Sequence, residues 1–202
     1  MQTYHRVGIF GGTFDPPHVG HLILAEECRT QLALDLLLWV VTDNPPHKRY
    51  TNVSPIEDRV YLVEKAIQGN PSFLSSRVDI DRPGPHYAID TVNLLKNEFP
   101  GAEMYYLMGG DSLHDLPTWN KPQEFIKICD GIGVMRRHAD AVDLVSLEAV
   151  LPGISEKVKI VEAPILEISS KQIRQRIMER MGYRYYLRDA VYQAIAELGM
   201  YQ

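Results

Sequence analysis

Short apolar runs alternate with amphipathic segments along most of this chain, and that alternation restricts the fold more than any other feature of the sequence. The first run covers residues 7–10 and is broken by Gly11 and Gly12, as expected of a buried strand that enters a tight turn. Similar apolar runs lie at residues 36–41, 77–80, 104–108, 132–135 and 158–161. The run at 36–41 is apolar throughout, which is typical of a parallel strand covered on both faces.

Segments with the features of helices separate and follow these runs. The expected helices cover residues 18–34, 54–68, 87–98, 122–129, 143–150, 170–181 and 188–198. The second begins with Ser54, Pro55 and Glu57 at the spacing of a capping box, which predicts Ser54 as its N-cap. Gly199 is the predicted C-cap of the last. Because strands that alternate with helices require crossover connections, we predict an α/β fold with a Rossmann-like, doubly wound parallel sheet and ligands at the carboxyl ends of its strands.

The length of the chain fits one domain over residues 1–202, in which residues from about 166 onward form a small helical portion. No stretch approaches the ~20 apolar residues that a membrane span needs, and the polar start leaves no room for a signal peptide, so we expect a cytoplasmic protein that does not bind a membrane. Cys28 and Cys129 lack zinc-ligand or CxxC spacing and are expected to be reduced thiols near the core.

A formal net charge of −5 argues against a general nucleic-acid surface, which needs a basic stripe. Any phosphate ligand must therefore be met by local groups. The sequence leaves the oligomeric state open, with a homo-oligomer as one option.

Residues 11–21, with the sequence GGTFDPPHVGH, link the first predicted strand to the first predicted helix. The glycines let the backbone approach a ligand closely, and the start of the helix offers N–H groups and the positive end of the dipole, so phosphate is the expected ligand. His18 and His21 lie three residues apart and project toward the same side. Gly20 inside the helix costs about 1 kcal/mol relative to alanine, and a flat ligand packed on the helix would explain it.

Two other interpretations of this histidine pair stay open from the residues alone. Both imidazoles are solvated groups at the start of a helix, or they bind zinc, for which the nearby Asp15 is a poorly placed third ligand. The chain contains neither GxGxxG nor GxxxxGK[ST], so neither hydride transfer nor P-loop hydrolysis is supported.

Two further segments carry groups suited to phosphate. In residues 168–174, ISSKQIR, a serine N-cap precedes Lys171 and Arg174, so hydroxyls, N–H groups and cations converge. An ordinary capped surface helix is the alternative for this segment. In NPPHK, after the second strand, Lys48 supplies a point charge.

Taken together, these segments resemble the nucleotidylyltransferase superfamily, whose marks are an [HT]xGH motif after the first strand and an ISSxxxR-like motif near the C-terminus. Within it the chain is similar to the bacterial nicotinate-nucleotide adenylyltransferases over residues 7–201. Five blocks carry the likeness in order: GGTFDPPHVGH, NPPHK, DRPGPHYAIDT, GGDSL with Trp119 following, and ISSKQIR. The resemblance implies an enzyme of NAD biosynthesis that transfers AMP from ATP to nicotinate mononucleotide, by direct in-line attack on the α-phosphorus and with pyrophosphate leaving.

The resemblance also implies a role for individual residues. The catalytic set would be His18, His21, Lys48 and Arg174, acting on the phosphates. ATP would contact Gly11, Gly12, Thr13, Phe14, Gly110, Asp111, Ser169 and Ser170. Nicotinate mononucleotide would contact Tyr87, Ala88 and Trp119, with Trp119 as the platform for the pyridine ring. Mg²⁺ is implied as a companion of ATP, although the sequence displays no dedicated carboxylate cage.

The chain departs from the family pattern at three positions. Lys171 stands where threonine is frequent and adds a cation near phosphate, whereas His86 and Ala88 replace serine and threonine on either side of Tyr87. These last changes bear on the choice of nicotinate over nicotinamide. Alternatives are therefore a related transferase acting on nicotinamide mononucleotide, phosphopantetheine or flavin mononucleotide, a fragment like the class I aminoacyl-tRNA synthetases, and a non-catalytic nucleotide sensor.

Overall fold

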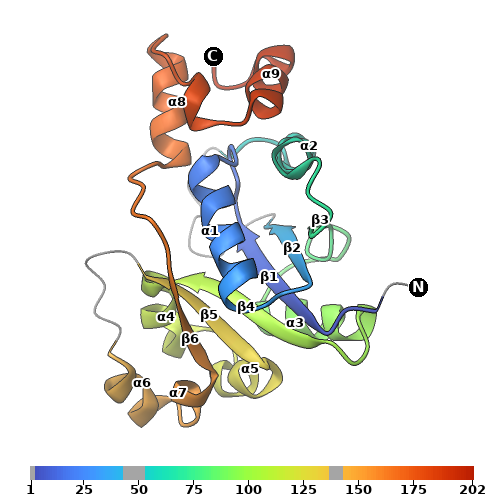
Figure 1. The fold of residues 1–202 in the computed structure, drawn as a ribbon, viewed down its shortest axis with the longest axis vertical. Helices are drawn as coiled ribbons and strands as arrows, with labels where there is room; N and C mark the ends of the chain where they lie inside the picture. Colours follow the sequence, from blue (N-terminus) through green and yellow to red (C-terminus); the bar gives the residue numbers. More distant parts are fainter. Residues whose placement is uncertain (1–2, 43–52, 137–142) are drawn as a thin grey trace.

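The computed structural model describes residues 3–42, 53–136 and 143–202, and in these residues six strands form one sheet in the order β3-β2-β1-β4-β5-β6 (Figure 1). Every neighbouring pair of strands is parallel. The strands are β1 Arg6–Gly12, β2 Leu36–Val41, β3 Phe73–Ser76, β4 Glu103–Gly109, β5 Gly131–Arg136 and β6 Val158–Glu162. The chain reverses its direction of winding between β1 and β4, so the carboxyl ends of these two strands form the switch point at which such sheets bind ligands.

Helices connect the strands and cover both faces of the sheet, which confirms the predicted doubly wound fold. They are α1 Val19–Gln31, α2 Ile56–Ile67, α3 Ala88–Glu98, α4 Gly110–Asp115, α5 Pro122–Ile128, α6 Leu144–Val150, α7 Ile154–Lys157, α8 Ser170–Met178 and α9 Asp189–Leu198, with 3₁₀ helices η1 Leu116–Thr118 and η2 Arg184–Tyr186. In the part of the chain that the structure describes, none of these helices combines the length and the hydrophobicity of a membrane span.

The residues of strand β2 contribute alternately to two buried clusters, one on each face of the sheet. All six of its residues are buried, as the uninterrupted apolar run predicts. Leu37, Trp39 and Val41 belong to a buried cluster with residues of α1 and α2. Leu36, Leu38 and Val40 belong to a second cluster with residues of α3 and α5. Because side chains alternate along a strand, an apolar residue at every position is needed when helices cover both faces.

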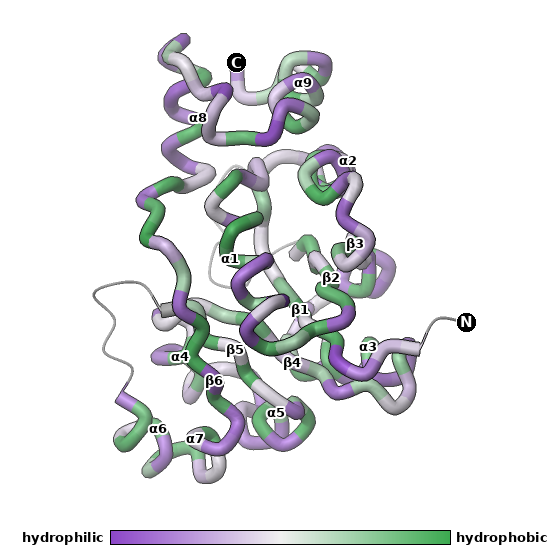
Figure 2. Tube along the Cα trace, viewed as in Figure 1, coloured by the Kyte–Doolittle hydropathy of each residue, from purple (hydrophilic) through white to green (hydrophobic). Residues whose placement is uncertain are grey.

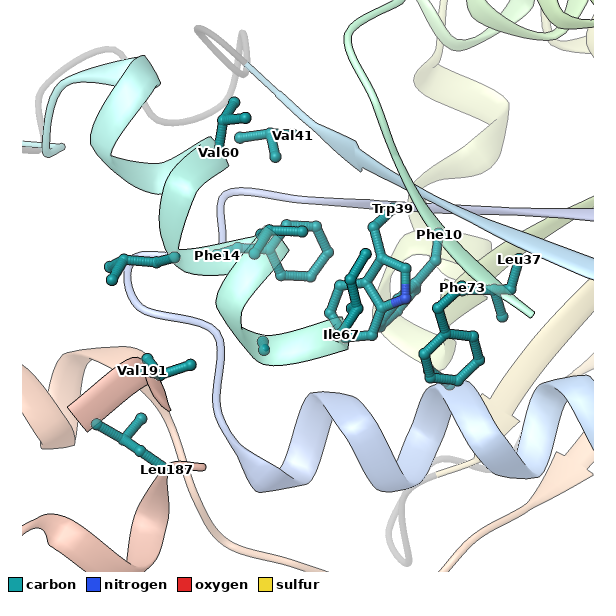
Figure 3. Close-up of a cluster of buried hydrophobic side chains, with 14 of the residues drawn as sticks. Phe10, Phe14, Leu37, Trp39, Val41, Val60, Ile67, Phe73, Leu187 and Val191 are labelled. Carbon is teal, nitrogen blue, oxygen red and sulfur yellow. The ribbon is translucent and has the colours of Figure 1, made fainter. Parts of the chain in front are cut away.

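The end of the chain packs beside the carboxyl end of β1. An extended segment after β6 leads to α8 and α9, which lie at one end of the molecule above α1 and α2 (Figure 1). Helix α8 is mostly hydrophilic (Figure 2), but its Ile173 and Ile177 are buried. Leu187 and Val191 approach the same cluster as Phe14 (Figure 3), so the C-terminal portion shares a core with α1 and α2.

Two predictions about local structure are wrong. The third strand lies at Phe73–Ser76 rather than at residues 77–80, which form a turn in which Ile80 N–H donates to the carbonyl of Arg77 (2.8 Å). The prediction was wrong because the apolar residues Val78 and Ile80 have the two-residue spacing of a strand. Helix α2 begins one residue later than predicted, with Pro55 and not Ser54 as N-cap, because the N–H of Ser54 donates to Asp15 and its carbonyl accepts from the side chain of Arg59.

The ends of two other helices also differ. Helix α1 stops at Gln31 and α8 at Met178, each three residues before the predicted end. The short helices α4 and α7 were not predicted, because four to six residues are too few to show a helical period. Gly199 has φ +61° and ends α9, so its prediction as a C-cap is confirmed.

Cys28 and Cys129 are buried free thiols, as predicted, and burial raises the pKa of each to about 12.

Candidate active site

The loop of residues 13–18 leaves β1 at the switch point and leads into α1. Phe14 has φ +48°, and its side chain is buried in the core (Figure 3), so a ligand at this position would meet its backbone. A Cβ added at Gly12 would lie 2.7 Å from Cζ of Phe14. Gly12 is therefore needed because the aromatic ring passes directly over it.

His18 and His21 lie together at the start of α1. His18 is the N-cap, and its ring stacks on that of His21 with 3.7 Å between ring centroids and 27° between planes. The backbone N–H of His18 donates to Nδ1 of His21 (3.2 Å). The ring of Phe14 meets that of His21 edge-on, with centroids 5.1 Å apart. The two imidazoles therefore form one packed unit with fixed orientations.

Gly20 has a reason for being glycine that the sequence does not reveal. A Cβ added there would lie 3.0 Å from Nδ1 and 3.1 Å from Cε1 of His18. His18 is only 6% exposed, so its ring has little room to move away. The space above Gly20 that the sequence suggests for a flat ligand is taken in part by the chain's own imidazole.

Residues 169–174 lie against the loop that precedes His18. The hydroxyl of Ser170 donates to the carbonyl of Pro16 (2.8 Å), and Nη1 of Arg174 donates to the carbonyl of Asp15 (2.6 Å). Ser169 caps α8, since its side-chain oxygen accepts from the backbone N–H of Gln172 (3.2 Å). The hydroxyl of Ser170 and the guanidinium of Arg174 thus bind the residues that shortly precede His18, although they come from the other end of the sequence.

Gly110 and Asp111 follow β4 and occupy the first turn of α4. Gly110 is buried and Asp111 is exposed. Because β4 pairs with β1 in parallel, with Phe10 opposite Leu107, the end of β4 adjoins the end of β1. These two residues therefore border the loop of residues 13–18 from the other side of the switch point.

The residues predicted to bind the second substrate form a separate group on the face covered by α3 and α5. Tyr87 is the N-cap of α3, and Ala88 is its first residue. The ring of Trp119 packs against those of Tyr106 (6.0 Å between centroids) and Phe125 (5.4 Å). The hydroxyl of Tyr106 lies 3.6 Å from the position of a Cβ at Gly11, so this group and the glycine loop meet at Tyr106. Burial raises the pKa of Tyr106 and keeps that hydroxyl protonated.

Arg59 is a residue of the site that the sequence reasoning missed. It is 1% exposed, and its Nη1 donates to the carbonyls of Thr13 (2.9 Å) and Thr42 (2.8 Å) while its Nε donates to that of Ser54 (3.0 Å). It therefore joins the ends of β1 and β2 to the start of α2. The available signal was its position four residues before Val63 on the buried face of α2.

A second missed group fixes the segment before α3. Asp79 is 4% exposed, and its Oδ1 accepts from Nη2 of Arg82 (2.8 Å) and from the hydroxyl of Thr91 (2.7 Å). Nη1 of Arg82 donates to the carbonyl of Pro85 (3.4 Å). This network holds the residues that lead to Tyr87 against the helix that Tyr87 opens.

Lys48, the remaining residue of the predicted catalytic set, lies outside the described residues. Within the described ranges, no group of three or more histidine, cysteine or carboxylate side chains is arranged to hold a metal ion. The carboxylate of Asp15, the one closest in sequence to the histidines, is bonded by Tyr201 and by the backbone of Ser54. The hydroxyl and the guanidinium beside the loop are hydrogen-bond donors that suit phosphate oxygens, so a Mg²⁺ ion would be held chiefly by the phosphates of a nucleotide.

Anion-binding groups at the switch point of a parallel sheet are typical of Rossmann-like nucleotide enzymes, and the comparisons with known proteins narrow this class. The family model described as cytidylyltransferase-like matches residues 9–176. Fold and matched residues together define a nucleotidyltransferase.

A protein of Thermomicrobium roseum named "Probable nicotinate-nucleotide adenylyltransferase" is 42% identical over 197 residues, which are 98% of this chain and 92% of that protein. A Dehalococcoides mccartyi protein of the same name is 38% identical over 97% of both chains. The chain therefore belongs to the cytidylyltransferase-like family and, within it, to the nicotinate-nucleotide adenylyltransferases.

Solved structures agree on the fold. The nicotinic acid mononucleotide adenylyltransferase of Plasmodium falciparum, complexed with NaAD, has a TM-score of 0.77 at 16% sequence identity and covers 98% of this chain and 97% of its own. The same protein complexed with APC has a TM-score of 0.76 at the same identity and coverage. At this identity the likeness concerns the arrangement of the elements alone.

Proposed function

We propose that this enzyme transfers AMP from ATP to nicotinate mononucleotide and forms nicotinate adenine dinucleotide and pyrophosphate in the biosynthesis of NAD. The observation that carries the proposal is the meeting of the stacked pair His18 and His21 with Ser170 and Arg174 at one loop. The names and near full-length coverage of the curated relatives support the same reaction.

His21 is the proposed donor to the phosphate on which charge accumulates. Its Nδ1 accepts a hydrogen bond from the backbone of His18, so the neutral ring carries its proton on Nε2. An N–H held in this fixed orientation stabilises the charge on the α-phosphate oxygens as the new bond forms. His18 acts with it, because the stacked rings fix each other's orientation.

The polyphosphate is proposed to lie between the loop of residues 13–18 and the start of α8. We expect it to contact the backbone at Gly11, Gly12, Thr13 and Phe14 and the first N–H groups of α8, a nine-residue helix capped by Ser169. Ser170 and Arg174 hold the loop through its carbonyls and contribute a hydroxyl and a cation to the same region. Lys48 is proposed to add a further positive charge, and Gly110 and Asp111 to meet the sugars of the nucleotide.

The reaction needs little covalent chemistry from the protein. The 5′-phosphate of the acceptor attacks the α-phosphorus in line, and pyrophosphate leaves from the opposite side. Holding the two substrates in this alignment supplies much of the rate enhancement. Mg²⁺ bound with ATP would neutralise part of the phosphate charge.

The acceptor is proposed to bind at Tyr87, Ala88 and Trp119. Trp119 offers an aromatic face to the pyridine ring, and the N–H groups at the start of α3 suit the nicotinate carboxylate. A site built from donors disfavours the carboxamide of nicotinamide, because its NH₂ group is itself a donor. Recognition through the backbone tolerates His86 and Ala88 where relatives often carry serine and threonine.

We further propose that residues 1–202 act as one domain in the cytoplasm. The buried cluster shared by Phe14, Ile173 and Val191 supports a single unit, since it includes both ends of the chain.

The direct test is to incubate the protein with Mg²⁺, ATP and one acceptor at a time, and to measure pyrophosphate and dinucleotide. Nicotinate mononucleotide is expected to give both products, with nicotinamide mononucleotide, phosphopantetheine and flavin mononucleotide as matched alternatives. Activity confined to another acceptor would overturn the proposed substrate. Binding of ATP without turnover on any acceptor would identify a nucleotide sensor instead.

A further inference from the structure

Three distant parts of the chain meet at Asp15, which is 2% exposed. Its Oδ1 accepts from the hydroxyl of Tyr201 (2.6 Å), and its Oδ2 accepts from the backbone N–H of Ser54 (3.2 Å). Its carbonyl oxygen accepts from Nη1 of Arg174 (2.6 Å), which also lies 3.8 Å from Oδ2. The residue therefore connects the loop after β1 to the start of α2, to α8 and to the end of the chain.

Tyr201 reaches this position in an uncommon conformation. It follows the helix α9 and its C-cap Gly199, and its φ of +65° lies in the left-handed region that residues other than glycine rarely adopt. Its ring is partly buried against the cluster that contains Phe14 and Ile173. Burial and the contact with Asp15 raise the pKa of Tyr201, so the hydroxyl is a protonated donor at neutral pH.

We propose that Tyr201 is a positioning residue for ATP: its bond to Asp15 sets the loop of residues 13–18 against the start of α8, and so fixes the distance between the histidine pair and Ser170 and Arg174. This inference rests on the proposed function, because it assigns those groups to one polyphosphate. Only two residues separate Asp15 from His18, so a shift of the aspartate moves the imidazoles directly.

The geometry supports action at a distance rather than direct contact with substrate. The hydroxyl of Tyr201 donates to Asp15, and the carbonyls of Asp15 and Pro16 are the points at which Arg174 and Ser170 hold the loop. Loss of the hydroxyl leaves a buried carboxylate oxygen without this donor, so the loop is held less firmly against α8, by Ser170 and Arg174 alone. Small displacements of groups that bind the same phosphate chain reduce affinity and rate.

The experiment compares Tyr201→Phe with Tyr185→Phe, a matched control in which the same hydroxyl is lost from a tyrosine of the C-terminal portion that is 92% exposed. Calorimetry with Mg·ATP, in the absence of acceptor, measures the Kd and the stoichiometry. We expect Tyr201→Phe to raise the Kd for ATP about tenfold, the usual effect of losing a hydrogen bond to a charged group, and Tyr185→Phe to leave it unchanged. The KM for nicotinate mononucleotide should stay constant in both variants.

The binding constant separates positioning from a general loss of stability. A purely structural role lowers the melting temperature and the fraction of protein that binds, but the remaining folded molecules keep the wild-type Kd. An unchanged Kd in Tyr201→Phe, or equal changes in the two tyrosine variants, would overturn the proposal.

A double-mutant cycle tests whether Tyr201 acts through Asp15. Asp15→Ala removes the acceptor, so adding Tyr201→Phe to it should change the Kd for ATP no further. Additive effects would show that Tyr201 acts by another route. Because ATP binding is measured without acceptor, these outcomes do not depend on which acceptor the enzyme uses. A wild-type protein that binds ATP and forms no dinucleotide would refute the proposed function. The Kd values of the variants would still decide whether Tyr201 positions the groups that bind ATP.

Discussion

The imidazole of His18 stacks on that of His21, and the backbone N–H of the first donates to Nδ1 of the second. The N-cap of α1 thus orients the side chain one turn further along the same helix. A neutral His21 that accepts at Nδ1 carries its proton on Nε2, the atom that can donate to a ligand. The backbone therefore fixes the direction in which the proposed phosphate donor points.

Replacing His21 with alanine is expected to lower kcat by about 10²-fold or more, since a donor aimed at developing charge is lost. Steady-state turnover at saturating ATP and nicotinate mononucleotide measures the effect. His5→Ala is the matched control, because His5 is exposed and precedes β1 at the opposite, amino end of the strand. Wild-type turnover in His21→Ala would show that the role of this residue is misassigned.

Gly20→Ala tests the packing of the histidine pair. The added methyl group would lie 3.0 Å from Nδ1 of His18, a buried ring, so the pair must shift. We expect kcat to fall about tenfold, while the free energy of unfolding changes by less than about 1 kcal/mol, because the helix propensity of alanine offsets the crowding. Gly182→Ala is the control, since a Cβ there meets nothing within 4 Å. Equal kcat values for Gly20→Ala and the wild type would contradict the expected shift.

The sequence predicted those parts of the fold that depend on local patterns. Of the six strands in the described residues, β2, β4, β5 and β6 match predicted apolar runs to within one residue at each end, and β1 matches its run to within two. The third strand was misplaced because Val78 and Ile80 alternate like a strand, whereas Phe73 pairs with Leu37. Which short run joins the sheet is decided by its partner strand, and that information is not local.

The same distinction between local patterns and distant partners applies to the residues of the candidate site. His18, His21 and Ser170 were predicted because their neighbours along the chain form recognisable motifs. Arg59 and Tyr201 were not, because their roles depend on partners far away in the sequence, such as Thr13 for the arginine and Asp15 for the tyrosine. No pattern within one segment indicates a contact of this kind.

Arg59→Ala should destabilise the protein strongly. It removes the buried guanidinium that donates to three carbonyl oxygens, those of Thr13, Thr42 and Ser54. We expect a loss of about 3 kcal/mol or more in the free energy of unfolding, measured by urea denaturation. Arg77→Ala is the control, because its ion pair with Glu57 is exposed and should contribute far less. Similar losses in the two variants would contradict a structural role specific to Arg59.

Trp119→Ala tests the proposed acceptor site. Its ring packs on Tyr106 and Phe125 but is only partly buried, so part of the side chain is accessible to a ligand. We expect the KM for nicotinate mononucleotide to rise about tenfold, as for the loss of an aromatic stacking partner, and the KM for ATP to stay constant. Trp119→Phe keeps an aromatic face and should restore most of the affinity. Because the two substrates are proposed to bind to different groups of residues, an equal rise in both KM values would mean that Trp119 supports the fold rather than the pyridine ring.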